Sequence, residues 1–260
     1  KPPQMPSTLD LPFRLSLASL QVGQLKIRRD DQLLLAADDV QLSLHYDGSR
    51  HQLRLRQMRV QPQGAAAISG RLSGELGIAS RPPFALAGQW RLDGAHAQGK
   101  AEGTLRLDGT LAALAAHFDL RVRRETLQAR VEGSASLRPF AAQPFAGARL
   151  RANALDLATL ARGWPQTRID AVVTMDSPQR GSFTLANAMP GPLDRGRLPL
   201  ADARGEFMVA PDALRLSSLS VNRGEFRGDV GLRRTREGSE WQAQGRLDGL
   251  RLADWRRVAG

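Results

Sequence analysis

The chain has 260 residues, of which 42% are hydrophobic and 24% are charged, a composition typical of folded proteins and not of disordered ones. Its formal net charge is +11, and since only Lys1, Lys26 and Lys100 are lysines, 34 of the 37 basic residues are arginines. The absence of cysteine excludes disulfides, thiolate catalysis and cysteine-ligated metal sites, and it suits an oxidising compartment.

The positive charge has two interpretations. It can form a surface for anionic partners such as nucleic acid or lipid headgroups, or it can reflect a GC-rich genome that encodes most basic positions as arginine. The arginines are spread along the whole chain without a basic block or an aromatic stacking platform, which disfavours a nucleic-acid-binding protein.

No segment reaches the roughly 18–20 apolar residues of a membrane-spanning helix. The chain begins at Lys1 and not at a methionine, so we expect a processed or excised piece of a longer protein, from which an anchor or targeting segment can have been removed.

In chain order, the first clear pattern is an eight-residue phrase, LSLASLQV at 15–22, which recurs as LRLRQMRV at 53–60 and LRLSSLSV at 214–221. The two residues of Leu-x-Leu share one face of a strand, and the following x-x step reverses the parity. We therefore predict a β-bulge in each phrase, which returns the apolar row to one face and curves the sheet. The alternative is that ordinary amphipathic strands look alike because leucine is common.

Strict alternation of polar and apolar residues continues through most of the chain, for example at 127–132, 149–154 and 226–233. The glycine-rich segment 70–77 alternates in the same way and lacks a following helix, so we interpret it as a strand and not as a phosphate loop. We expect about 16–20 strands in all. The expected turns are Asp47-Gly48, Asp93-Gly94, Asp108-Gly109, Pro190-Gly191 and Glu237-Gly238.

Helical spacing is confined to two short segments, LDLATLARGW at 155–164 and its echo LRLADWRRVAG at 250–260. Each predicts one or two helical turns, the first ending at Gly163.

These patterns predict an all-β fold: a long, curved, taco-like open-groove sheet, or β-solenoid-like trough, with an apolar interior. We expect residues 1–260 to form one continuous segment, with a subdivision near 140–165 as the alternative. The predicted groove residues are Leu15, Leu17, Leu20, Val22, Leu53, Leu55, Val60, Leu127, Val131, Leu150, Phe183, Leu185, Leu214, Leu216, Leu219, Val221, Phe226 and Val230.

No segment carries recognisable catalytic chemistry. The four histidines, at 45, 51, 96 and 117, have no metal-ligand spacing, and there is no Gly-x-Ser-x-Gly motif. The acidic pairs Asp30-Asp31 and Asp38-Asp39 are of the kind found in turns, and the four tryptophans are far apart in sequence. We therefore predict a protein that is not an enzyme and holds no cofactor or metal.

Five stretches together resemble the TamB family, the inner-membrane half of the translocation and assembly module, within the wider AsmA-like group. They are LPFRLSLASLQVGQLKI (11–27), QLRLRQMRVQPQGAAAISGRLSGELGI (52–78), PFALAGQWRLDG (83–94), ANALDLATLARGWPQTRIDAVV (152–173) and LPLADARGEFMVAPDALRLSSLSVNRGEFRGDVGL (198–232). Their order and density carry the resemblance.

The resemblance implies a periplasmic protein of a Gram-negative bacterium, anchored in the inner membrane by a segment absent from this chain. It implies transport of phospholipid between the two membranes, with the acyl chains as ligand, and a role in assembling outer-membrane proteins. The family's contact with the outer-membrane barrel TamA is made through its C-terminal end, so we do not expect this segment to make it.

Two functions are compatible with the sequence. The first is a lipid-transfer groove, which needs an unfilled apolar interior. The second is a periplasmic chaperone or scaffold, whose open sheet edge pairs with nascent outer-membrane β-strands.

Overall fold

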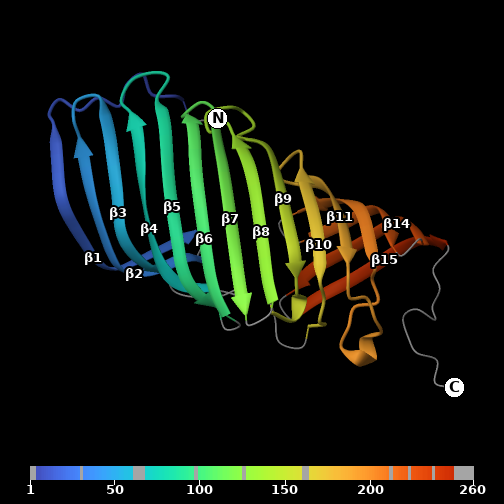
Figure 1. Cartoon of the computed structure of the whole chain (residues 1–260). Helices are drawn as coiled ribbons and strands as arrows, with labels where there is room; N and C mark the ends of the chain where they lie inside the picture. The colour runs from blue at the N-terminus through green and yellow to red at the C-terminus, as the bar shows by residue number, and fades with distance from the viewer. Residues whose placement is uncertain are drawn as a thin grey trace. The chain divides into compact units, whose positions relative to one another are not determined.

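A computed structural model describes residues 4–29, 32–60, 68–96, 99–124, 127–159, 164–210, 213–221, 224–235 and 238–248. Within these ranges the chain forms fifteen β-strands and two 3-10 helices of three residues each (Figure 1). The predicted all-β class is therefore confirmed. Within the described residues, no helix is long and apolar enough to cross a membrane.

The chain divides into two compact units. The first comprises residues 1–128 and 132–146, and the second comprises residues 129–131 and 147–260. The boundary after Ala146 falls within residues 140–165. A single groove running through both units stays a prediction.

The first unit is an open antiparallel sheet in which each strand pairs with the next along the chain. Figure 1 shows these strands as long, curved ribbons. The strands are β1 (Leu15–Arg29), β2 (Gln32–Tyr46), β3 (Arg50–Val60), β4 (Ile68–Ala79), β5 (Ala85–His96), β6 (Gly99–Thr110) and β7 (Leu114–Arg124), followed by β8 (Leu127–Leu137), whose residues are divided between the units.

The second unit contains most of β9 and six further strands, again antiparallel and paired in chain order. The strands are β9 (Phe145–Leu155), β10 (Ile169–Met175), β11 (Arg180–Asn187), β12 (Asp202–Val209), β13 (Ala213–Val221), β14 (Gly224–Thr235) and β15 (Gly238–Asp248), with the 3-10 helices η1 (Leu157–Thr159) and η2 (Leu193–Arg195).

The strands are fewer than the alternation predicted, and two of the predicted turns, Asp93-Gly94 and Asp108-Gly109, lie within the strands β5 and β6. Gly94 lies inside β5, opposite Gly70 of β4. A Cβ on Gly94 would lie 2.4 Å from the backbone oxygen of Ser69, so the glycine allows close approach of two strands and does not make a turn. The fifteen strands of the described residues are thus below the expected 16–20.

The predicted turn at Asp47-Gly48 is confirmed and joins β2 to β3. The Asp47 carboxylate accepts hydrogen bonds from the backbone N–H groups of Ser49 and Arg50 at 2.7 and 2.8 Å, and Gly48 has a φ of +103°. The Ser49 hydroxyl, followed by these two N–H groups, lowers the pKa of Asp47 to about 2. The turn is therefore held by an ionised aspartate.

The acidic pair Asp38-Asp39 lies inside β2, so its assignment to a turn is wrong. Two residues of β2 between Asp38 and Gln41 face one residue of β3, and Asp39 has a φ of +52°. Aspartate tolerates this left-handed conformation better than most residues, which explains its place at a bulge. The pair Asp30-Asp31 lies outside the described residues.

The short helix predicted at 155–164 is observed as η1, a single turn that ends at Thr159, and residues 160–163 lie outside the described part. Buried Thr167 holds this turn: its hydroxyl accepts a hydrogen bond from the Leu157 N–H at 2.8 Å and donates to the Leu155 carbonyl at 3.1 Å. The echo at 250–260 also lies outside the described residues.

Candidate functional site

The repeated phrase carries a bulge in all three places. Between Leu17 and Leu20, two residues of β1 face one of β2. Between Leu55 and Met58, two residues of β3 face one of β4. In β13, the two residues between Ser217 and Ser220 face one of β12, one position after the predicted step. The extra residue keeps the apolar residues of each phrase on one face, so the predicted bulges are confirmed, the third with a shift of one position.

On one face of the first unit, apolar residues form rows that run from strand to strand, which we call the apolar face. Three rows cross all seven strands without a polar residue. They are Leu17, Leu44, Leu53, Leu76, Gly88, Leu107 and Ala116; Leu20, Leu42, Leu55, Gly74, Trp90, Leu105 and Phe118; and Leu25, Ala37, Val60, Gly70, Gly94, Ala101 and Val122. With strands roughly 4.8 Å apart, a seven-strand row is about 29 Å long.

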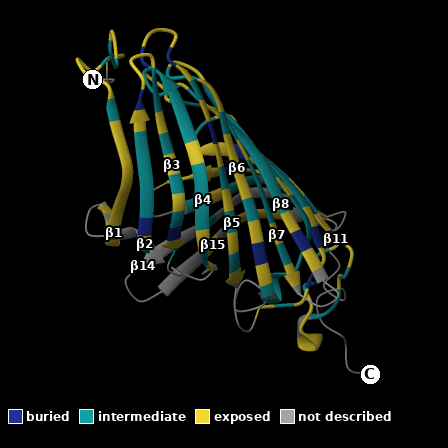
Figure 2. Ribbon diagram, turned by 60° about the vertical axis from the view of Figure 1, so that its left-hand side comes forward, coloured by how far each residue is buried: buried dark blue, intermediate teal, exposed yellow. Residues whose placement is uncertain are grey.

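Most side chains of the apolar face are only half-buried. The fully buried cluster is small and consists of Ala37, Val40 and Met58, with half-buried neighbours such as Leu72 packed against it. Figure 2 shows this grading along the strands, where exposed and intermediate residues alternate. Leu20 and Leu105 are 41% and 38% exposed. The face therefore retains apolar surface that the described residues do not fully cover.

Trp90 fills the space left by two glycines of the apolar face. A Cβ on Gly74 would lie 2.5 Å from Cδ1 of the indole, and a Cβ on Gly88 would lie 2.5 Å from its Cη2. The ring therefore lies flat along the sheet and spans positions of β4 and β5. A flat ring adds apolar area without standing up into the space above the sheet.

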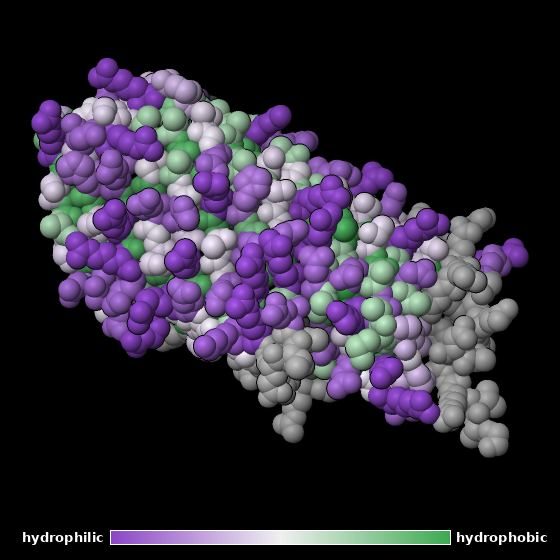
Figure 3. Space-filling view, viewed as in Figure 1, coloured by the Kyte–Doolittle hydropathy of each residue, from purple (hydrophilic) through white to green (hydrophobic). Residues whose placement is uncertain are grey.

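The opposite face of the first unit, which we call the charged face, carries arginines and carboxylates in cross-strand register. Arg54 lies 3.6 Å from Glu75, and Arg59 lies 3.0 Å from Asp39. These side chains are about half to two-thirds exposed, so each pair stabilises the fold by at most about 1 kcal/mol. Figure 3 shows hydrophilic side chains predominating over the strands of this unit on the side seen there.

The structure places the predicted groove residues of the first unit together. Leu17 and Leu53 share one row and Leu20 and Leu55 the next, while Val60 lies in the third. Val22 packs against the buried cluster, and Leu15 lies opposite Tyr46 at the end of β2.

The second unit also brings predicted residues together. Leu150 and Phe183 are joined through Val173, and Leu185 and Val221 are joined through Ala203, across neighbouring strands. Of the remaining predicted residues, Val131, Leu214, Leu216 and Leu219 are half-buried, whereas the side chains of Leu127, Phe226 and Val230 lie outside those described.

More than half of the apolar face was not predicted from the alternation. The residues not anticipated include Leu42, Leu44, Leu72, Leu76, Leu92, Leu105, Leu107, Phe118 and Leu120. Glycine stands at many apolar positions of β4 to β6 and hid the alternation there. Counting glycine as compatible with the apolar face would have found these strands.

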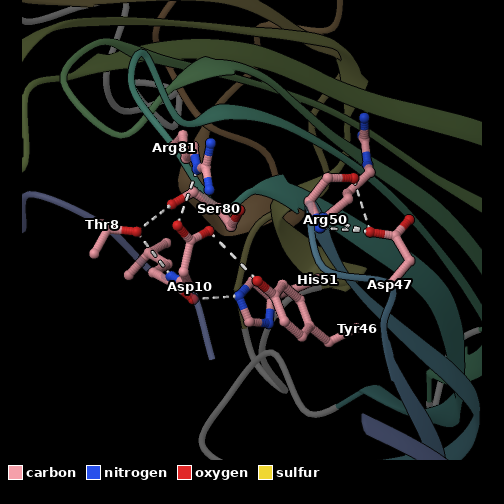
Figure 4. A network of polar contacts seen from close by, with 10 residues as sticks. Thr8, Asp10, Tyr46, Asp47, Arg50, His51, Ser80 and Arg81 are labelled. Atoms are coloured by element: carbon pink, nitrogen blue, oxygen red, sulfur yellow. Dashed lines mark hydrogen bonds and ion pairs between the residues drawn. The ribbon is translucent and has the colours of Figure 1, made fainter. Parts of the chain in front are cut away.

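A network of polar contacts closes one end of the first unit, where the segment before β1 crosses the ends of β2 to β4 (Figure 4). The Asp10 carboxylate lies 2.9 Å from Arg81 Nε, the Leu9 N–H donates to the Ser80 carbonyl at 2.7 Å, and His51 Nε2 lies 2.8 Å from the Leu9 carbonyl. The His51 ring stacks on Tyr46 at 4.3 Å. The network fixes this segment over the end of the sheet.

The pKa of Asp10 is lowered to about 2 by the neighbouring Ser80 hydroxyl and by Arg81. The Ser80 hydroxyl is buried without a hydrogen-bond partner among the described residues, so the ion pair with Arg81 is the contact that holds the pKa of Asp10 down. His51 and Tyr46 serve here as structural residues, and we find no group of metal-ligating side chains among the described residues.

No protein-family model, curated protein or solved structure matches the chain. The candidate site is therefore described by its geometry alone. It is an apolar sheet face with partly exposed side chains, and the opposite face of the same sheet is charged. The described part of the chain shows no convergent set of reactive groups.

Proposed function

We propose that the chain is a segment of a periplasm-spanning, bridge-like lipid transfer protein that shields phospholipid acyl chains against an apolar β-sheet. The observation that carries the proposal is the set of unbroken apolar rows across β1 to β7. Acyl chains require apolar contact without directional bonds, so such rows need no polar motif to bind them.

The dimensions of the rows support this ligand class. A row of about 29 Å is close to the thickness of a bilayer's hydrocarbon core, roughly 30 Å, which holds two acyl chains end to end. Exposed leucines such as Leu105 would be removed from water on binding. Each Å² of apolar surface covered would contribute about 25 cal/mol to the free energy of binding. The periplasmic setting comes from the resemblance to the TamB and AsmA-like proteins and is part of the proposal.

Neighbouring residues on opposite faces of β6 allow a matched test. Leu105 belongs to the apolar face, and Thr104 is exposed on the charged face. Leu105→Asp and Thr104→Asp each add one negative charge to the same strand. We expect Leu105→Asp to abolish binding of a fluorescent phospholipid analogue and Thr104→Asp to retain it, with circular dichroism confirming that both variants are folded. Equal binding by the two folded variants would count against the groove.

The chaperone alternative depends on the open edge of the sheet. β1 stands at the end of the strand order and pairs with β2, and its exposed Leu17 and Leu20 would allow a further strand to continue two apolar rows. A synthetic amphipathic β-strand peptide that binds the chain, and that a lipid analogue does not displace, would favour this second function.

A further inference from the structure

The first unit has a concavity of about 770 Å³ whose polar lining belongs to the charged face, and whose lining also includes members of the first apolar row, Leu17, Leu44, Leu53, Leu76 and Gly88. Its floor is formed by the small residues Gly77 and Ala87, which lie in one cross-strand row between Gln52 and Asp108. Because longer side chains stand in the neighbouring row, the missing side-chain volume at Gly77 creates a hollow in a face that is otherwise crowded.

The side chain of Arg50 lies in this hollow. A Cβ on Gly77 would lie 2.7 Å from Nη2 of the Arg50 guanidinium and 2.8 Å from its Nε. The guanidinium therefore lies directly on the sheet, in the space that any larger residue at position 77 would fill. Arg50 is half-buried, whereas neighbouring arginines of the face such as Arg54 and Arg106 are exposed. Its charged group is held within the concavity.

The lining of the concavity is positively charged. It contains the arginines at positions 50, 54, 56 and 106 against the two carboxylates Glu75 and Asp108. These carboxylates make only long ion pairs, with 3.6 Å between Arg54 and Glu75 and 3.7 Å between Arg106 and Asp108. Within the described residues, the side chains of Arg50 and Arg56 have no acidic partner. Two guanidinium groups are thus available to a ligand, and Gln52 and Gln89 supply further donors.

We propose that this concavity is a binding site for a phosphate group. A guanidinium donates two parallel hydrogen bonds to a phosphate, and its planar geometry favours such oxyanions over a spherical anion. Arg50 would contact the ligand from the floor and Arg56 from the bulge of β3. The phosphate can belong to a lipid headgroup or be free in solution, because both present the same oxygens.

The site does not depend on the proposed lipid function. Acyl chains would occupy the apolar face, whereas the polar side chains that line this concavity belong to the charged face. A chain that binds no lipid could therefore still bind phosphate, and the reverse. Lipid binding and phosphate binding are measured by different assays.

Three variants of the full chain test the site. Arg50→Gln/Arg56→Gln removes the two arginines without acidic partners. Arg71→Gln/Arg123→Gln removes the same charge from exposed positions outside the concavity. Gly77→Ala leaves the net charge unchanged and displaces only the flexible end of Arg50. Binding of inorganic phosphate and of glycerol phosphate is measured by calorimetry at about 150 mM salt, where the Debye length is about 8 Å.

We expect the Arg50/Arg56 variant to raise the Kd of both probes at least about tenfold, the usual effect of losing charged hydrogen bonds. Gly77→Ala should raise it several-fold, and the Arg71/Arg123 variant should change it less than about twofold. Equal weakening by the two double variants would overturn the proposal, because binding would then follow net charge. Absence of saturable phosphate binding to the unmodified chain below about 10 mM would overturn it as well.

Vesicles distinguish the two sources of the phosphate. Binding to vesicles that contain phosphatidylglycerol, displaced by soluble glycerol phosphate and lost in the Arg50/Arg56 variant, would identify a lipid headgroup. Binding of the soluble probes without vesicle binding would identify a free phosphate compound. Either result supports a phosphate site on the charged face.

Discussion

Replacement of Gly74 by alanine should destabilise the first unit substantially, because the apolar face leaves no room for a side chain there. The new Cβ would lie 2.3 Å from the Gln89 carbonyl oxygen and 2.5 Å from Cδ1 of Trp90. Ordinary contacts begin near 3.4 Å, so β4 and β5 would have to separate by about 1 Å locally or Trp90 would have to leave its place. We expect a loss of about 2–3 kcal/mol in the free energy of unfolding, at the upper end for overpacked sites, because the obstructing atom is backbone.

Gly23 provides the matched control. It also lies within a strand, β1, but no atom comes within 4 Å of a Cβ placed there. Gly23→Ala should be neutral or stabilise by up to about 1 kcal/mol, since alanine loses less backbone entropy on folding. Urea unfolding followed by circular dichroism gives both values, and hydrogen exchange in β4 and β5 locates the effect. A Gly74→Ala chain within about 0.5 kcal/mol of the unmodified chain would refute the packing described for Trp90.

Three further predictions concern the elements that frame the apolar face. Asp10→Asn should lower the urea midpoint at pH 6. Because the folded-state pKa of Asp10 is depressed to about 2, its stabilisation is present above about pH 4 and is lost as the pH falls towards 2. A difference in urea midpoint between the two chains that is the same at pH 2 as at pH 6 would contradict the ion pair with Arg81. Deletion of Ser19 removes the extra residue of β1 and leaves Leu17 and Leu20 two positions apart, so both stay on one face of a regular strand. Hydrogen exchange in β1 should then be no faster than in the unmodified chain, and faster exchange would contradict the bulge. Thr167→Val should cost about 1–3 kcal/mol in the second unit, since it leaves the Leu157 N–H without its acceptor; a smaller loss by calorimetry would show that water replaces the hydroxyl.

The local features of the fold were predictable because they follow from residue periodicity. The bulge at Ala18-Ser19 could be read from a change of parity between Leu17 and Leu20, and the turn at Asp47 from a dipeptide with a known conformation. Gly94 was misread because the same Asp-Gly signal also occurs where two strands approach closely. A single sequence does not distinguish these two uses of glycine.

Contacts between residues distant in sequence were not predictable. Asp10 and Arg81 are separated by 71 positions, and their ion pair depends on how the segment before β1 crosses the sheet. The contact of the Arg50 guanidinium with Gly77 likewise depends on the register between β3 and β4. Alternation assigns a residue to a face, but only the register determines which residues of neighbouring strands meet there.

Binding of phospholipid acyl chains to the apolar rows is tested most directly by native mass spectrometry of the purified full chain, followed by lipid analysis of its organic extract. We expect phospholipid bound at a defined stoichiometry in the unmodified chain and in Thr104→Asp, and its loss in Leu105→Asp. A chain that circular dichroism shows to be folded, yet that carries no lipid and takes up none from vesicles, would contradict the proposed lipid function.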